Sequence, residues 1–128
     1  MARILMANDD TDLLDGCREI LEGAGHEVRS VAGGREALAI AVSWQPDLII
    51  VDWVMPDMDG TTVILELRKS ERTASLRILM ISGSLNARVM AGRAGSDGFL
   101  PKPFDADELL RAVGMLIDTG RPAGPAPV

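Results

Sequence analysis

The sequence predicts an α/β fold in which helices cover both faces of a parallel sheet. Short apolar runs alternate with segments whose apolar residues recur at helical spacing, five times along the 128-residue chain. The central run, Leu48–Val51, is aliphatic at every position, which is typical of a strand buried on both faces. It ends at Asp52, and open α/β sheets place their ligand sites at the carboxyl ends of the strands.

The composition narrows the class of protein. A chain of 128 residues, 47% of them hydrophobic, suffices for one domain with a substantial core. The net charge of −6 argues against a nucleic-acid surface, and no apolar run reaches the length of a membrane span. The start of the chain lacks the layout of a signal peptide. Cys17 is the one cysteine, so an internal disulfide is impossible, and a cytoplasmic location is expected.

Two strands and two helices are expected before the central strand. Residues 3–7 form an apolar strand that ends at Asn8-Asp9-Asp10. A helix follows, capped by Asp10 or Thr11 and ended by Gly23 or Gly25. Residues 27–31 form a weaker strand, and residues 35–44 form a helix that Pro46 closes off. His26 is expected to be an exposed turn residue.

Three helices and two further strands are expected after the central strand. A loop through Asp57 and Asp59, read as solvated acids, leads to a helix around 63–67, with Arg68 and its charged neighbours solvated at its end. A strand over 77–82, a short helix over 85–94 and a short strand and turn over 98–103 follow. The final helix spans 105–118 and begins with a capping box of Asp105 and Glu108. Residues 120–128, rich in Pro, Ala and Gly, are expected to be a disordered tail.

Parallel strands with right-handed connections bring several polar residues to one edge of the sheet: Asn8, Asp9, Asp10, Asp52, Ser82 and Lys102. Carboxylates held close together repel each other, and a divalent cation relieves that repulsion. Oxygen ligands suit Mg²⁺. With a lysine and a hydroxyl nearby, the edge has what phosphoryl transfer to a carboxylate requires.

At these positions the chain resembles the receiver domain of a two-component response regulator, over about residues 3–118. The acidic stretch after the first strand, Asp52 with the loop Met55–Gly60, Ser82-Gly83 and Lys102-Pro103-Phe104 each match a motif of that family, in the same order. The resemblance implies a flavodoxin-like, doubly wound sheet in the order 2-1-3-4-5, and a cis peptide before Pro103. It also implies a single-domain, chemotaxis-regulator-like receiver over residues 1–119 without an output domain.

The same resemblance implies roles for individual residues. Asp52 would accept a phosphoryl group from a sensor histidine kinase or a histidine phosphotransfer protein. Asp9 and Asp52 would bind Mg²⁺ together with the backbone carbonyl of Val54, and Asn8 would contact the cation through a water molecule. Lys102 and Ser82 would contact phosphoryl oxygens. Ser82 and Phe99 would then switch the surface of the fourth helix, fifth strand and fifth helix for a protein target. Such a protein is a self-phosphorylating and self-dephosphorylating phosphoacceptor, not an enzyme in the usual sense.

Three other functions compete with this interpretation. A haloacid-dehalogenase-like hydrolase would need a second acid at Val54, and a flavodoxin-like cofactor binder would need a phosphate cradle instead of the acids that follow the first strand. The third alternative is a receiver-like interaction module that is not phosphorylated. It is supported by Asn8, which stands where the family usually has an acid. Phe99 is read equally as edge packing or as a switch, and Trp53 as partly exposed over the site.

Overall fold

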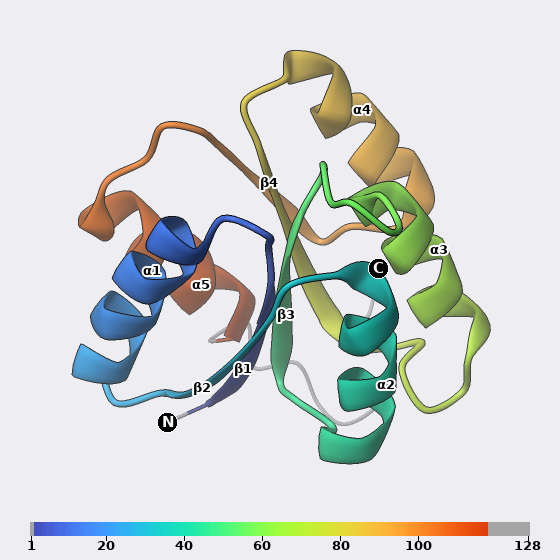
Figure 1. Ribbon diagram of the computed structural model, residues 1–128, viewed down its shortest axis with the longest axis horizontal. Helices are drawn as coiled ribbons and strands as arrows, with labels where there is room; N and C mark the ends of the chain where they lie inside the picture. The colour runs from blue at the N-terminus through green and yellow to red at the C-terminus, as the bar shows by residue number, and fades with distance from the viewer. Residues whose placement is uncertain (1, 118–128) are drawn as a thin grey trace.

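The computed structural model describes residues 2–117, which form a five-stranded parallel sheet between two layers of helices (Figure 1). The elements are β1 (Arg3–Ala7), α1 (Thr11–Gly23), β2 (Glu27–Val31), α2 (Gly34–Trp44), β3 (Leu48–Asp52), α3 (Gly60–Lys69), β4 (Arg77–Ser82), α4 (Leu85–Ala94), β5 (Gly98–Pro101) and α5 (Ala106–Ile117). The strand order β2-β1-β3-β4-β5 confirms the predicted fold. Among the described residues no helix is long and apolar enough to cross a membrane.

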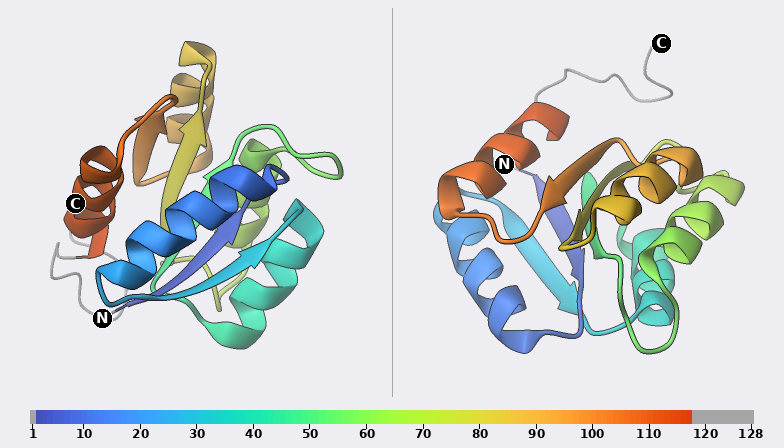
Figure 2. Two further views of the ribbon diagram at one scale, coloured as in Figure 1. Left: turned by 60° about the vertical axis from the view of Figure 1, so that its left-hand side comes forward. Right: turned by 90° about the horizontal axis from the view of Figure 1, so that it is seen from above.

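The sheet divides the interior into two separate cores. Helices α1 and α5 cover one face, and α2, α3 and α4 cover the other (Figures 1 and 2). Because side chains alternate along a strand, Leu48 and Ile50 of β3 face α1 and α5, whereas Ile49 and Val51 face α2, α3 and α4. Every residue of β3 is buried, as its aliphatic run predicts. Cys17 lies in the core under α1 and α5, where burial raises the pKa of its thiol.

Two helix starts confirm the caps expected from the sequence. Asp10 caps α1, and its Oδ1 accepts a hydrogen bond of 3.1 Å from the Leu13 amide. Before α5, the Glu108 amide donates to Asp105 Oδ1 at 2.8 Å, and the Asp105 amide donates to Glu108 Oε1 at 3.0 Å. The predicted last residue of that helix and the proline-rich tail of residues 120–128 lie outside the described residues.

Asp57 and Asp59 are exposed, but describing them as solvated loop acids was incomplete, because each caps a helix. The Asp57 carboxylate accepts hydrogen bonds from the amides of Gly34 (2.9 Å) and Arg35 (3.0 Å), and these bonds lower its pKa. Helix α2 therefore begins at Gly34, one residue earlier than predicted, although Gly33 provides no side-chain cap. Asp59 caps α3 through a 2.8 Å bond from the Thr62 amide. The loop after β3 is thus fixed to the helices on either side of it.

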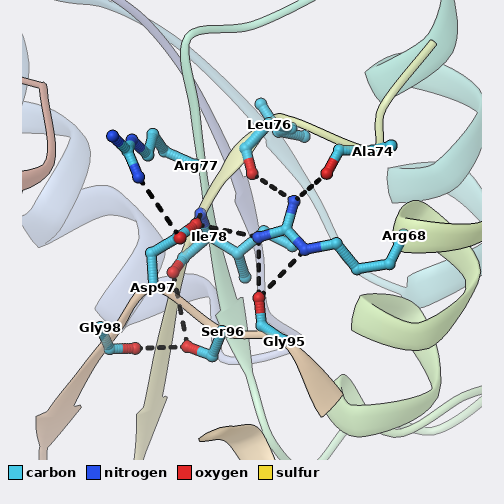
Figure 3. Close-up of polar contacts among 9 residues, drawn as sticks. All are labelled: Arg68, Ala74, Leu76, Arg77, Ile78, Gly95, Ser96, Asp97 and Gly98. Atoms are coloured by element: carbon cyan, nitrogen blue, oxygen red, sulfur yellow. Dashed lines mark hydrogen bonds and ion pairs between the residues drawn. The ribbon is translucent and has the colours of Figure 1, made fainter. Parts of the chain in front are cut away.

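The prediction that Arg68 is solvated was wrong. Its guanidinium lies between α3 and the start of β5, and it donates to the carbonyl oxygens of Ala74, Leu76 and Gly95 and to the carboxylate of Asp97 (Figure 3). Asp97 in turn accepts a hydrogen bond from the Ile78 amide and pairs with Arg77. These contacts join α3, the α3–β4 connection and the end of α4.

His26 and Trp44 close the amino-terminal end of the sheet. The prediction that His26 is a plain exposed residue was wrong, because the side chain is half-buried and its Nδ1 accepts a 3.1 Å hydrogen bond from the Ala2 amide. Trp44, the last residue of α2, is nearly buried. The guanidinium groups of Arg3 and Arg29 lie 5.1 and 4.5 Å from the centre of its ring. Side-chain packing and hydrogen bonding therefore hold this end of the sheet.

Candidate functional site

The polar residues predicted to meet at one edge do so. Asp52 and Ser82 are the last residues of β3 and β4, and Asn8 and Lys102 directly follow β1 and β5. The register pairs Ala7 with Val51, which places Asn8 beside Asp52 in the neighbouring strand. The Lys102 amide donates to the Ser82 carbonyl oxygen at 2.9 Å, which ties the end of β5 to the end of β4. The strand order thus sets side by side residues that are far apart in the sequence.

Asp52 is a nearly buried carboxylate with one cationic partner. It is 6% exposed, and its Oδ1 lies 3.2 Å from Lys102 Nζ. Burial raises the pKa of Asp52, and the charge of Asp9 raises it further. The hydrogen bond and charge of Lys102 oppose this rise. Burial and the charge of Asp9 therefore destabilise the ionised form of Asp52, and the half-buried Lys102 partly offsets this effect.

The donor set fits Mg²⁺. Within residues 2–117 there is no group of three or more His, Cys, Asp or Glu side chains placed to hold a metal ion, so a cation at this edge would draw on two acids and on other oxygens. Mg²⁺ is commonly held by one or two carboxylates and keeps several waters. The repulsion between Asp9 and Asp52 is what such a cation would neutralise. Asp9 is exposed, so it is open to a hydrated ion.

The loop after Asp52 is closed by Gly60, a residue that the sequence marked only as a loop signal. The Gly60 amide donates to the Trp53 carbonyl oxygen at 2.8 Å. A Cβ atom added at Gly60 would lie 2.5 Å from the backbone oxygen of Asp52, so only glycine fits without a shift of the backbone. The loop carries Val54, whose side chain is 68% exposed, and Trp53, which is half-buried as predicted. Gly60 therefore fixes the position of the segment that would supply the Val54 carbonyl.

Ser82 and Phe99 lie toward the other face of the sheet from Asp52. Strand alternation turns Ser82 toward α3 and α4, and its Oγ accepts a 3.0 Å hydrogen bond from the Ser84 amide. Ser82 is 4% exposed. Phe99 is half-buried and packs against the core under α2, α3 and α4. The Ser82 hydroxyl at the end of β4 is thus hydrogen-bonded to Ser84, the residue directly before α4.

A cavity of about 410 Å³ opens beside Lys102, lined by Asp10, Leu13, Lys102, Pro103 and Phe104. The Lys102-Pro103 peptide is cis, as the resemblance implies. Leu13 and Phe104 were not among the predicted site residues. Leu13 was expected only as an apolar residue of the first helix, and Phe104 only as the last residue of the motif Lys102-Pro103-Phe104, so only the fold reveals that both line this cavity.

Comparisons with known proteins agree with this geometry. The family model described as "Response regulator receiver domain" matches residues 4–114. The DNA-binding dual master transcriptional regulator RpaA of Synechocystis is 40% identical over 119 residues, which cover 91% of this chain and 49% of RpaA. The chain spans about half the length of the curated relatives it matches.

Two of the similar solved structures match over nearly their whole length. The chemotaxis protein CheY4 of Vibrio cholerae has a TM-score of 0.85 at 32% identity, covering 91% of this chain and 98% of that one. The receiver domain of the sensor histidine kinase PA1611 of Pseudomonas aeruginosa has a TM-score of 0.86 at 27% identity, covering 92% and 98%. That structure has a magnesium ion coordinated in its active-site cleft.

Proposed function

Because the chain belongs to the response regulator receiver family of two-component signalling, we propose that it accepts a phosphoryl group on Asp52 from a sensor histidine kinase or a histidine phosphotransfer protein. The family is a phosphoacceptor signalling module rather than a classical enzyme. The observation that carries the proposal is the Asp52 carboxylate, nearly buried at the end of the central strand and 3.2 Å from Lys102. The single cysteine fits a cytoplasmic protein.

The chemistry follows from the placement of this chain's own residues. An ionised oxygen of Asp52 attacks phosphorus, the bond from phosphorus to the histidine nitrogen breaks, and that nitrogen keeps the electron pair. Lys102 neutralises part of the charge on the phosphoryl oxygens. Asp9, Asp52 and the Val54 carbonyl would hold Mg²⁺, which supplies further neutralisation of those oxygens. Later attack of water on phosphorus breaks its bond to the Asp52 oxygen, releases inorganic phosphate and returns the free carboxylate, so uptake and loss both occur at the chain's own site.

The signal would leave the site through Ser82. A phosphoryl oxygen at Asp52 attracts the Ser82 hydroxyl, which now accepts from the Ser84 amide directly before α4. Movement of Ser82 shifts the start of α4 and vacates space into which Phe99 turns. The surface formed by α4, β5 and α5 then changes for a downstream protein. On α4 this surface exposes Leu85, Val89 and Met90, apolar side chains suited to a protein partner.

A second candidate is a receiver-like interaction module that is not phosphorylated. Asn8 favours it, because an amide at this position removes one negative charge from the cation site. Such a module would present the same surfaces without an added phosphoryl group.

Intact mass spectrometry separates the two functions. The protein is incubated with a small-molecule phosphodonor, with and without Mg²⁺, beside an Asp52→Asn variant. We expect one phosphoryl group on the wild-type protein, only with Mg²⁺, and none on the variant. A folded wild-type protein that gains no mass and binds no Mg²⁺ would establish the unphosphorylated module.

A further inference from the structure

The side-chain amide of Asn8 is buried at the site, and only its oxygen has a hydrogen-bond partner among the described residues. The side chain is completely buried, and its Oδ1 accepts a 2.9 Å hydrogen bond from the Asp10 amide. Its Nδ2 is buried and has no hydrogen-bond partner among the described residues. A buried donor without a partner carries a free-energy cost, so this atom calls for an acceptor that the protein alone does not provide.

The orientation of the amide is fixed by chemistry. Exchanging its oxygen and nitrogen would set an NH₂ group against the Asp10 N–H, donor to donor, and would lose the hydrogen bond. The backbone amide of Asn8 is also fixed, because it donates to the Val31 carbonyl oxygen at 3.0 Å. The buried side-chain atom of Asn8 that lacks a partner is therefore an N–H donor.

Asn8 and Asp52 are neighbours on the same face of the sheet. The register that pairs Ala7 with Val51 sets Asn8 beside Asp52, one step further along both strands. By alternation both side chains turn toward the layer of α1 and α5, as Met6 and Ile50 do before them. The unpaired donor thus lies on the same face of the sheet as the Asp52 carboxylate, which pairs with Lys102.

We propose that Asn8 binds the anion at Asp52 and not the cation. Its Nδ2 donates a hydrogen bond to an oxygen or fluorine of a phosphoryl group or phosphoryl mimic carried by Asp52. The cation site keeps only the charges of Asp9 and Asp52, offset by Lys102, so it binds Mg²⁺ weakly until the anion arrives. This revises the expectation of a water-mediated Mg²⁺ contact by Asn8, and it rests on the proposed function, which makes Asp52 the acceptor.

The test compares the wild type with Asn8→Ala and Asn8→Asp in two binding titrations. Mg²⁺ binding is measured by calorimetry without any anion. Binding of beryllium fluoride, an anionic phosphoryl mimic, is measured at saturating Mg²⁺ by the fluorescence of Trp53, which adjoins Asp52. Asn86→Ala and Asn86→Asp, at an exposed position of α4, make the same chemical changes away from the pocket. Circular dichroism checks that each variant is folded.

We expect Asn8→Ala to bind Mg²⁺ within about twofold of wild type, and beryllium fluoride about tenfold more weakly, as for a lost hydrogen bond to a charged group. We expect Asn8→Asp, which keeps the acceptor for the Asp10 amide, to bind Mg²⁺ about tenfold more tightly. That factor is of the order expected for the attraction between one added charge and a nearby divalent cation in a water-like dielectric. The same variant should bind beryllium fluoride more weakly, and the Asn86 variants should match wild type.

Two results would overturn the inference. One is a Mg²⁺ affinity that falls more than about threefold in Asn8→Ala, which would assign Asn8 to the cation. The other is beryllium fluoride binding that is unchanged in Asn8→Ala or, if that variant does not fold, in Asn8→Asp. If the wild type binds beryllium fluoride and the Asn8 variants give either of these results, the inference about Asn8 fails and the proposed function is unaffected. A wild type that binds none at all would refute both.

Discussion

Replacing Arg68 with alanine tests whether the contacts shown in Figure 3 stabilise the domain. The guanidinium donates to the Gly95 carbonyl oxygen from Nε (3.0 Å) and Nη2 (2.7 Å), and to the oxygens of Ala74 (2.9 Å) and Leu76 (2.6 Å) from Nη1. Nη2 also lies 2.9 Å from Asp97 Oδ2. The side chain is 22% exposed, so most of its donors are shielded from water.

The expected loss follows from these contacts. A hydrogen bond from a charged donor contributes about 1.5–3 kcal/mol, but bonds made by one group are not additive, and water can reach part of this site. The free energy of unfolding should therefore fall by about 2–4 kcal/mol in Arg68→Ala. For a domain of this size, such a loss lowers the melting temperature by roughly 8–15 °C.

Urea and thermal unfolding measure this loss, with two comparison variants. Arg72→Ala removes an exposed arginine four residues further along and should change the stability by no more than about 0.5 kcal/mol. Arg68→Lys keeps the charge without the planar set of donors, so it should lie between wild type and Arg68→Ala. If Arg68→Ala lost less than about 1 kcal/mol, or no more than Arg72→Ala, the stabilising role of these contacts would be refuted.

Three further predictions concern the site itself. Because the pKa of Asp52 is raised, its contribution to stability is largest below the ordinary carboxyl pKa and is lost as the pH rises through the raised value. Unfolding of Asp52→Asn should therefore need more urea than that of wild type at neutral pH, with the difference vanishing in acid; a less stable variant at neutral pH would contradict the assigned cause. Gly60→Ala should lose about 1–3 kcal/mol and bind Mg²⁺ more weakly, because the new Cβ meets the Asp52 backbone, and wild-type behaviour in both assays would show that the loop yields freely. Lys102→Ala should keep the fold but lose the coupling between phosphorylation and the α4 surface, read by hydrogen exchange of α4 with and without phosphodonor; an unaltered phosphorylation-dependent change would remove Lys102 from the switch.

The helices and strands could be predicted from local patterns because the signal for each element lies within a short stretch of sequence. The aliphatic run of β3 and the capping box of Asp105 and Glu108 need no distant partner to be recognised. The sequence missed chiefly the contacts that join residues far apart in the chain. Asp57 caps α2 from 23 residues away, and Arg68 reaches Gly95 across 27 residues. No periodicity announces such partners, so composition alone made these residues look solvated.

The same distinction holds at the site. The sequence could predict that Asp52 and Lys102 lie close together, because the carboxyl ends of parallel strands meet at one edge of the sheet. The free donor of Asn8 could not be predicted from the sequence. Its orientation depends on which side-chain atom of Asn8 the Asp10 amide binds. Likewise Gly60 looks like any loop glycine until the backbone of Asp52 is seen 2.5 Å from where a Cβ atom would be. The sequence therefore predicts which residues meet at the site, whereas the orientation of their polar atoms follows only from the structure.

The separation of the interior into two cores has a consequence for how such a domain can diverge. The residues packed under α1 and α5 share no buried side-chain cluster with those under α2, α3 and α4. Asp52 faces the first layer by alternation and Ser82 faces the second, so residues that face different layers come together at the carboxyl edge of the sheet. Substitutions on one side can accumulate without repacking the other. The outer surfaces of the two helix layers can therefore change independently in sequence, provided that the few residues of that edge are left alone.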